Sequence, residues 1–350
     1  MRTFLKYYYR FRLGRIILVA RTILLLLGCL LSTSLPAKSD KAPLTIVVSI
    51  KPIKLLMQSF IGEHAQVIQL IPDGLSPHDF QLKLSDLRKI KNSDFVIWLG
   101  PSAEPYLVKV FHQISTPRID AFNLQGIHHL PYRNLNQWQS SSEPLQHSDD
   151  SNDHGHDHGH NHGHSHHAVH TDLHFWLNFG NNRILIDEVA RYLIQRNLMP
   201  EEIVKIKRQQ MQVQFDSIEQ LLLSSNNGFS NNGVSKNQQD RKVLAYHDAF
   251  QYLEKELKLN NFGAVVADIE AGVGLKRLMK LKRLVEKENI SCVLTTSTSN
   301  HKTLKKIFSH FSYQSANVDI LAVNPKLDTL EKYWLDMIKE VTRCVEWERP

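Results

Sequence analysis

Residues 44–71, "LTIVVSIKPIKLLMQSFIGEHAQVIQLI", contain the pattern that decides the fold. A run rich in Ile and Val is followed by Pro52 and a segment of helical periodicity, and a second apolar run begins at residue 66. β-Branched residues favour strands, and proline suits the first turn of a helix. The stretch therefore predicts a strand, a helix and a second strand, which is the unit of a parallel sheet.

The same alternation recurs on both sides of a long polar region. We expect the first series to contain strands at 44–50, 66–71 and 94–100 and helices at 53–62, 84–93 and 104–114. The second series is expected to contain strands at 242–246, 262–266, 291–296 and 317–323 and helices at 249–257, 275–288, 302–311 and 329–347. Two further helical patterns, at 183–197 and 201–224, lie between the series.

The sequence thus predicts an α/β protein with two lobes, each a mostly parallel β-sheet flanked by helices. The expected parts are a signal peptide at 1–37, an N-terminal lobe at 38–180, a long linking helix at 181–199 and a C-terminal lobe at 200–350. Ligands of open α/β sheets bind beyond the carboxyl ends of the strands. In a two-lobed protein this location is the cleft between the lobes.

The first 37 residues differ from the rest of the chain. Six basic residues and no acidic ones accompany the apolar run "TILLLLGCLLSTSL", which is followed by Pro36 and Ala37. This order is that of a secretory signal, with an uncleaved membrane anchor or a lipid anchor on Cys29 as alternatives. These six charges account for all but one of the formal net charge of +7. The basic composition therefore gives no indication of nucleic-acid binding.

Two cysteines, Cys292 and Cys344, lie outside this segment. In an exported protein such a pair is expected to form a disulfide, because disulfides persist in oxidising compartments. The bond would connect the strand expected at 291–296 to the last helix. Two buried free thiols are the alternative.

A histidine-rich segment occupies residues 139–171. It consists mainly of small and polar residues that cannot bury enough surface to offset the entropy of ordering, so we expect a disordered loop. Closely spaced imidazoles in a flexible segment offer many metal sites of low specificity at high local concentration. A solvated spacer with incidental metal binding is the alternative. The candidate auxiliary metal ligands are His154, His156, His158, His160, His162, His164, His166, His167 and His170.

Three other histidines share a position relative to the predicted strands. His78 follows the strand at 66–71, His247 follows the strand at 242–246, and His174 in "DLHFWL" begins the ordered region after the loop. Each of them alone is more typical of a hydrogen-bonded structural residue. Together they would meet at the cleft, so they are the candidate ligands of a primary site.

Four stretches of the chain resemble a known family. They are "SIKP" (49–52), "LIPDGLSPHDFQLKLSDLRKIKNSDFVIWLG" (70–100), "DLHFWL" (172–177) and "YHDAF" (246–250). In order and spacing, residues 44–346 resemble the metal-binding proteins of bacterial ABC importers, in particular the zinc-uptake branch. The histidine-rich loop lies where zinc members carry one, and the cysteine pair resembles that branch's disulfide.

The resemblance implies a non-enzymatic zinc carrier of the periplasm. It would bind Zn²⁺, its transported ligand, through His78, His174 and His247 in the interlobe cleft and deliver it to the ABC permease in the inner membrane. The loop would serve as auxiliary zinc capture, and the protein is expected to be a monomer. Imidazole ligands suit zinc, whereas manganese prefers oxygen ligands.

The chain departs from the family pattern at two places. Pro77 stands where some zinc relatives have an acidic residue before the first histidine, and Thr295 and Thr296 offer only hydroxyls where many relatives carry a carboxylate. A fourth protein ligand is therefore not assigned. Asp79 and Asp248 follow candidate ligands directly, either as helix N-caps, the favoured interpretation, or as partners that orient the rings.

Other functions remain as alternatives at this point. The cargo would be manganese or iron in a related carrier, or the protein would buffer zinc or act like an adhesin without a transporter. Three histidines also describe a zinc hydrolase, but the "HExxH" spacing is absent and no carboxylate is placed as a general base.

Overall fold

The computed structural model describes residues 43–77, 80–131, 133, 171–226, 241–266 and 273–347. These residues belong to one compact unit, which begins at Pro43. The expected signal peptide at 1–37, with Cys29, lies outside the described residues, and so does the histidine-rich loop up to residue 170. Among the described residues, no helix is long and apolar enough to cross a membrane.

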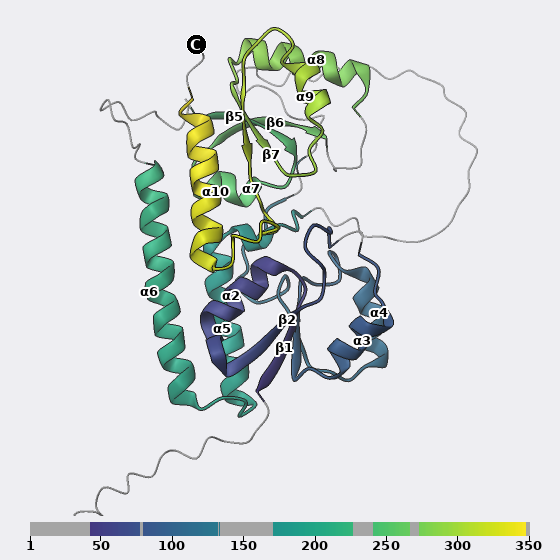
Figure 1. Cartoon of the computed structure of the whole chain (residues 1–350), viewed down its shortest axis with the longest axis vertical. Helices are drawn as coiled ribbons and strands as arrows, with labels where there is room; N and C mark the ends of the chain where they lie inside the picture. Colours follow the sequence, from purple (N-terminus) through teal and green to yellow (C-terminus); the bar gives the residue numbers. More distant parts are fainter. Residues whose placement is uncertain are drawn as a thin grey trace, which may run out of the picture. The chain divides into compact units, whose positions relative to one another are not determined.

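The first lobe, which contains β1 and β2 in Figure 1, has a parallel sheet with the strand order β2-β1-β3-β4. Its strands are β1 (Leu44–Val48), β2 (Ala65–Gln69), β3 (Phe95–Trp98) and β4 (Arg118–Asp120). The connecting helices are α2 (Lys51–Ile61), η1 (Gly62–His64), α3 (Leu84–Lys91) and α4 (Pro105–Gln113). The three expected strands and helices are all present. The short edge strand β4 has no sequence pattern that would predict it.

Helix α2 shows how the sequence determines these elements. Pro52 lies in its first turn, where the missing amide hydrogen costs nothing. Ile53, Leu56, Met57 and Phe60 recur at helical spacing and are almost completely buried against the sheet. The helix ends at Gly62, whose φ of 59° is one that glycine adopts without strain.

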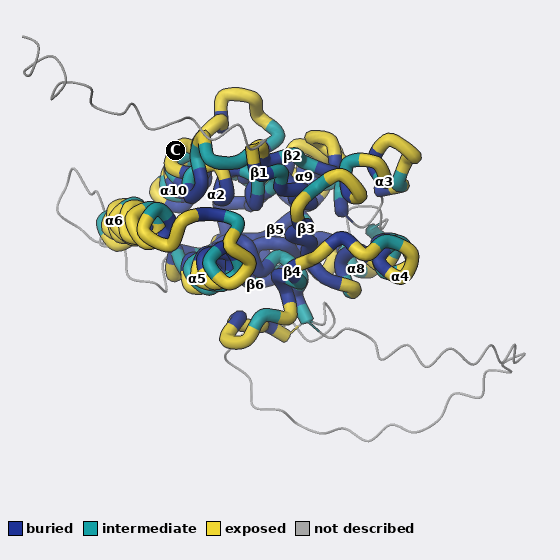
Figure 2. The backbone as a smooth tube through the Cα atoms, turned by 90° about the horizontal axis from the view of Figure 1, so that it is seen from below, coloured by how far each residue is buried: buried dark blue, intermediate teal, exposed yellow. Residues whose placement is uncertain are grey.

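The second lobe repeats this architecture with the strand order β6-β5-β7-β8, again parallel. Its strands are β5 (Lys242–His247), β6 (Asn260–Val266), β7 (Cys292–Thr295) and β8 (Gln314–Asn317). Its helices are α7 (Gln251–Glu256), α8 (Leu275–Lys287), α9 (His301–Ile307) and α10 (Leu330–Val345). The buried residues follow the sheets and the inner faces of these helices (Figure 2).

The strand expected at 317–323 is wrong in its position. The strand β8 ends at Asn317, and the residues after it form turns. The carboxylate of Asp319 accepts hydrogen bonds from the backbone N–H groups of Val323 and Asn324, and Ala322 has a φ of 54°. An aspartate that bonds its own downstream backbone competes with strand pairing, so the apolar run "DILAV" lines a loop instead.

Two long helices follow the short 3-10 helix η2 (Phe175–Leu177). Helix α5 (Phe179–Gln195) overlaps the expected linking segment at 181–199 but begins two residues before it, and α6 (Glu201–Asn226) runs alongside it (Figure 1). Helix α6 packs against α5 and also against α2 of the first lobe and α10 of the second. Helix α6 therefore contacts helices of both lobes, and so does α5, which packs on α2 and, through Phe179, on Trp334 of α10. The predicted boundaries at 181–199 stay a prediction.

The disulfide between Cys292 and Cys344 is formed, as expected. It connects β7 to α10 across 52 residues of chain. The alternative of two free thiols is thereby excluded. A cross-link of this span stabilises mainly by restricting the unfolded chain.

A buried carboxylate connects the carboxyl ends of β1 and β3. Glu104 is completely buried and accepts hydrogen bonds from the Ser49 hydroxyl (2.7 Å), the Leu99 backbone N–H (2.6 Å) and the Tyr106 hydroxyl (3.2 Å). Burial raises the pKa of Glu104 to about 7, although these hydrogen bonds act in the opposite direction. The aromatic ring of Tyr106 packs on Phe80, so the cluster also contacts the end of the loop that carries His78.

This cluster predicts a pH-dependent stability. The folded-state pKa of about 7 lies above the ordinary value of 4.5, so Glu104 contributes stability that is complete below pH 4.5 and is lost as the pH rises through 7. The free energy of unfolding should fall by roughly 2–3 kcal/mol between pH 5 and pH 8 from this group alone. Urea unfolding of the wild type and of Glu104→Gln measures the difference. The control is Glu63→Gln, at an exposed site. Equal pH slopes for wild type and Glu104→Gln would contradict the assignment.

Candidate metal site

His247 is the last residue of β5, a central strand of the second sheet. Its neighbours β6 and β7 run parallel to it, so its side chain lies at the carboxyl edge of the sheet, as predicted. Parallel sheets present their ligands at this edge. The second lobe therefore places the His247 imidazole in a cavity that residues of the first lobe also line.

His174 immediately precedes the 3-10 helix η2 and is held by Asp172. The Asp172 carboxylate accepts hydrogen bonds from the His174 backbone N–H (2.9 Å) and from its ring Nδ1 (2.8 Å). Donation from Nδ1 leaves Nε2 with a lone pair, which is the form that binds a metal ion. Sequence reasoning missed Asp172, although its place two residues before a candidate ligand was a usable signal.

Asp172 is kept ionised in spite of its burial. Only 3% of its surface is exposed, and one of its two oxygens has no hydrogen-bond partner among the described residues. Burial by itself would raise the pKa of the carboxyl group. The His174 ring, the two hydrogen bonds from His174 and the Arg133 guanidinium outweigh this effect and lower the pKa. A charged carboxylate makes the opposite ring nitrogen a stronger metal ligand.

The rings of His174 and His247 lie next to each other, with centroids 5.7 Å apart. Two imidazoles on one tetrahedral zinc, at Zn–N distances of about 2.0–2.1 Å, have centroids roughly 5 Å apart. Both rings line a cavity of about 870 Å³. Two of the three predicted ligands are therefore close enough to share an ion.

The third predicted ligand, His78, lies outside the described residues, as does Asp79. The four residues before it, from Gly74 to Pro77, line the same cavity from the first lobe. Among the described residues, no group of three His, Cys, Asp or Glu side chains is arranged to hold a metal ion. The complete ligand set of His78, His174 and His247 thus stays a prediction.

The hydroxyl-rich segment after β7 lies where the fourth ligand was left unassigned. Thr296, Ser297 and Thr298 line the cavity, whereas the Thr295 hydroxyl donates to the Ala316 carbonyl. The Thr296 hydroxyl is within hydrogen-bond distance of the Thr298 hydroxyl, at 3.0 Å. These side chains can bind an ion only weakly, because zinc prefers nitrogen, thiolate and carboxylate ligands.

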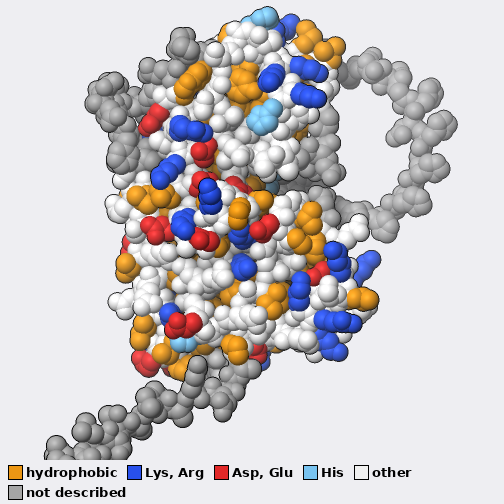
Figure 3. All heavy atoms as spheres, viewed as in Figure 1, with side chains coloured by type: hydrophobic (Ala, Val, Ile, Leu, Met, Phe, Trp, Pro, Cys, Tyr) orange, Lys and Arg blue, Asp and Glu red, His pale blue; other side chains and the backbone are white. Residues whose placement is uncertain are grey.

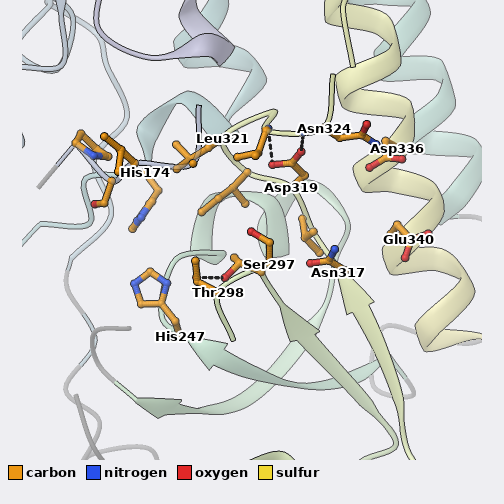
Figure 4. Close-up of a pocket in the computed structure, with 18 of the residues that line it drawn as sticks. His174, His247, Ser297, Thr298, Asn317, Asp319, Leu321, Asn324, Asp336 and Glu340 are labelled. Carbon is orange, nitrogen blue, oxygen red and sulfur yellow. Dashed lines mark hydrogen bonds between the residues drawn. The ribbon is translucent and has the colours of Figure 1, made fainter. Parts of the chain in front are cut away.

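Carboxylates line the cavity on the side away from the histidines. Figure 4 shows Asp336 and Glu340 on α10, and Asp319 between them and the histidines. The pKa of Asp336 is raised by burial and by the neighbouring Glu340 and Asp319. No pattern in the sequence predicts these carboxylates at the cavity, because residues 317–323 are predicted as a strand and α10 as an ordinary amphipathic helix.

The interpretation of Asp248 as a helix N-cap is wrong. Helix α7 begins at Gln251, and its N-cap position is Phe250 without a side-chain cap. The buried Asp248 carboxylate instead forms a salt bridge with Arg133, which also pairs with Glu254. Burial raises the pKa of Asp248, partly offset by Arg133. Asp248 therefore anchors the end of the segment that precedes the histidine-rich loop.

The described residues that precede and follow the histidine-rich loop are joined next to His174. Pro131 and Thr171 form an isolated antiparallel bridge, and the Asp172 N–H donates to the Leu130 carbonyl at 2.8 Å. The Tyr252 hydroxyl of α7 accepts from the Leu130 N–H and donates to the Asp172 carbonyl. Thr171, the last residue of the loop, lies three positions before His174, and the bridge places Pro131 beside it.

The chain is similar in sequence to proteins of a known family. The family "ZnuA: Zinc-uptake complex component A periplasmic" matches residues 46–346. The chain is 23% identical over 287 residues to the "High-affinity zinc uptake system protein ZnuA" of Yersinia pestis, which covers 82% of this chain and 86% of the relative. The Haemophilus influenzae protein of the same name is 34% identical over 92 residues, 26% of each chain.

Solved structures share the fold. A crystal structure of ZnuA matches with a TM-score of 0.66 and 15% identity over 87% of this chain and 99% of that one. The periplasmic zinc-binding protein TroA of Treponema pallidum matches with a TM-score of 0.64 and 14% identity, also over 87% of this chain and 99% of the other. The family match extends from the first strand to the end of the last helix, and the chain therefore belongs to the family of the periplasmic zinc-uptake complex component A.

Proposed function

We propose that this protein is the zinc-binding component of an ABC importer, which captures Zn²⁺ between its two lobes and delivers it to the membrane permease. The observation that carries the proposal is the adjacency of His174 and His247 in a cavity lined by both lobes. The family is that of a solute-binding transport component rather than an enzyme. We infer that residues 1–37 direct export.

The donor set favours zinc over manganese or iron. His174 presents a nitrogen whose opposite side is bonded to a carboxylate, an arrangement that is typical of zinc ligands. The carboxylates of the cavity lie away from the histidine pair (Figure 4). Three imidazoles and one open position would hold zinc and still let it leave.

The ion can be released because the ligands of the site come from different lobes. His247 belongs to the second sheet, and the Gly74–Pro77 segment before His78 belongs to the first lobe. A movement of one lobe against the other would separate the ligands and weaken binding. The permease would then need only to bind the conformation of lower zinc affinity more tightly.

The ligand assignment is tested by alanine substitution in a chain that lacks residues 147–170, so that the loop histidines do not contribute. His78→Ala, His174→Ala and His247→Ala should each lower zinc affinity by about 100-fold or more, because each removes one of three nitrogen ligands. Competition titration with a zinc chelator measures the affinity. The control is His112→Ala, an exposed residue of α4. Full affinity after any of the three changes removes that residue from the site, and displacement of zinc by equimolar manganese argues against a zinc carrier.

The role of Asp172 is tested by Asp172→Asn. The amide oxygen can still accept from Nδ1 of His174, but it lacks the charge that strengthens the opposite nitrogen, so zinc affinity should fall by about 10- to 100-fold. The matched control is Asp328→Asn, which removes an exposed carboxylate bonded to Lys332. A loss of affinity for Asp172→Asn that is no larger than for the control would show that Asp172 is only structural.

The histidine-rich loop is proposed to capture zinc beside the cavity. The chain enters and leaves the loop next to His174, because Pro131 and Thr171 are bridged and Asp172 bonds to Leu130. Ions bound by the loop would therefore raise the local zinc concentration near the primary site. Deletion of residues 147–170 should slow growth at limiting zinc and leave growth at ample zinc unchanged. A second variant replaces the nine tract histidines by serine at constant length, and it should show the same growth defect if the imidazoles rather than the length of the loop are responsible. Normal growth of both strains at limiting zinc would leave the loop as a spacer.

A further inference from the structure

Outside residues 1–37, the positive charge of the protein is concentrated in one part of the second lobe. Residues 273–310 carry nine Lys and Arg and two Asp and Glu, a formal charge of +7. Residues 38–350 together have a formal charge of +1, so the rest of this stretch has a formal charge of −6. The concentrated part comprises α8, β7 and α9.

Helices α8 and α9 pack against each other and cover a face of the second sheet. Leu281, Val285, Leu304 and Ile307 form the buried side of this pair. The opposite side is basic, and Figure 3 shows the Lys and Arg side chains gathered there, at the upper end of the molecule. We call this side the basic face. Its exposed cations are Lys276, Lys280, Arg283, Lys287, Lys302, Lys305 and Lys306.

The cations of the basic face are not used to stabilise the fold. Among the described residues, no salt bridge connects any of these seven to a carboxylate. Arg277, by contrast, is turned inward and donates to the carbonyl of Val265, and Lys242 pairs with Glu288. Seven like charges that repel one another cost stability, and an anionic partner outside the protein would relieve this cost.

Two apolar side chains project from the same region. Leu275 is 72% exposed and Met279 is 51% exposed, one turn apart on α8. They alternate with Lys276 and Lys280 along the helix. Exposed apolar side chains among lysines are typical of surfaces that lie at the boundary between lipid headgroups and acyl chains.

We propose that the basic face of α8 and α9 binds the surface of a membrane that contains anionic phospholipids. The ammonium groups contact headgroup phosphates, and Leu275 and Met279 enter the interfacial layer. Six of the seven exposed cations are lysines. Lysine is a flexible point charge that suits the diffuse field of a lipid surface, whereas arginine predominates where a fixed carboxylate is recognised. Membrane binding goes beyond zinc capture, because it would keep the zinc-loaded carrier at the surface of the membrane that contains the permease.

The test uses residues 43–350, the compact unit, with EDTA present so that the histidine-rich segment carries no zinc. Co-sedimentation compares vesicles of phosphatidylcholine alone with vesicles that contain about 30% phosphatidylglycerol. We expect binding only to the anionic vesicles at about 25 mM salt and loss of binding at about 0.5 M salt. Failure to bind anionic vesicles at low salt would overturn the proposal and favour an acidic protein as the partner, without affecting zinc affinity.

Matched charge variants locate the binding surface. The basic-face variant combines Lys280→Gln, Arg283→Gln, Lys305→Gln and Lys306→Gln, and it should lower the partition coefficient at least about tenfold. The control removes the same charge elsewhere through Lys205→Gln, Lys326→Gln, Lys332→Gln and Lys339→Gln. An equal loss in both would show that only net charge matters and would overturn the assignment. Thermal unfolding checks that each variant is folded.

A second pair of variants tests the apolar contribution. Leu275→Ser with Met279→Ser keeps the charge of the basic face and should lower partitioning several-fold. Val213→Ser, at an exposed position of α6, is the control. Unchanged partitioning of the double variant would contradict the insertion of these two side chains and would overturn the proposed mode of membrane binding.

Discussion

Asp172 connects the parts of the chain that have to meet at the metal site. Its carboxylate holds the backbone and the ring of His174, its N–H bonds to Leu130, and its carbonyl accepts from Tyr252 of the second lobe. A buried carboxylate of this kind is tolerated only while its charge is compensated. The site and the base of the histidine-rich loop are therefore fixed by the same residue.

The network around Arg133 supports that arrangement from the other side. Arg133 forms salt bridges with Asp248, which follows His247 in the sequence, and with Glu254, which belongs to α7. Burial of the two carboxylates would be unfavourable without the guanidinium. The bond from Asp172 preorganises the His174 ring before an ion arrives, whereas Asp248, the neighbour of His247 in sequence, is engaged with Arg133.

The sequence predicted the architecture well because it depends on patterns that are local. Alternating β-branched runs and amphipathic helices specify the parallel units, and an exported chain with two remaining cysteines specifies the disulfide. Local patterns were insufficient where a side chain changes the path of the backbone. The Asp319 carboxylate turns "DILAV" into a loop, and β4 is too short to show periodicity.

The site was predictable in part for the same reason. Histidines at strand ends are visible in sequence, and His174 and His247 do meet. The partners of those histidines are not visible, because the Asp248–Arg133 pair joins residues 115 positions apart. Sequence neighbours suggested a cap for Asp248, whereas long-range ion pairing determined its role.

The bond between Cys292 and Cys344 has a consequence for where the carrier can become active. The cytosol keeps thiols reduced, so a chain that has not yet been exported lacks the link between β7 and α10. The same lobe supplies His247. In a reducing compartment the sheet edge that carries His247 would therefore lack one of its covalent supports, and the lobe would reach its full stability only where oxidation completes it.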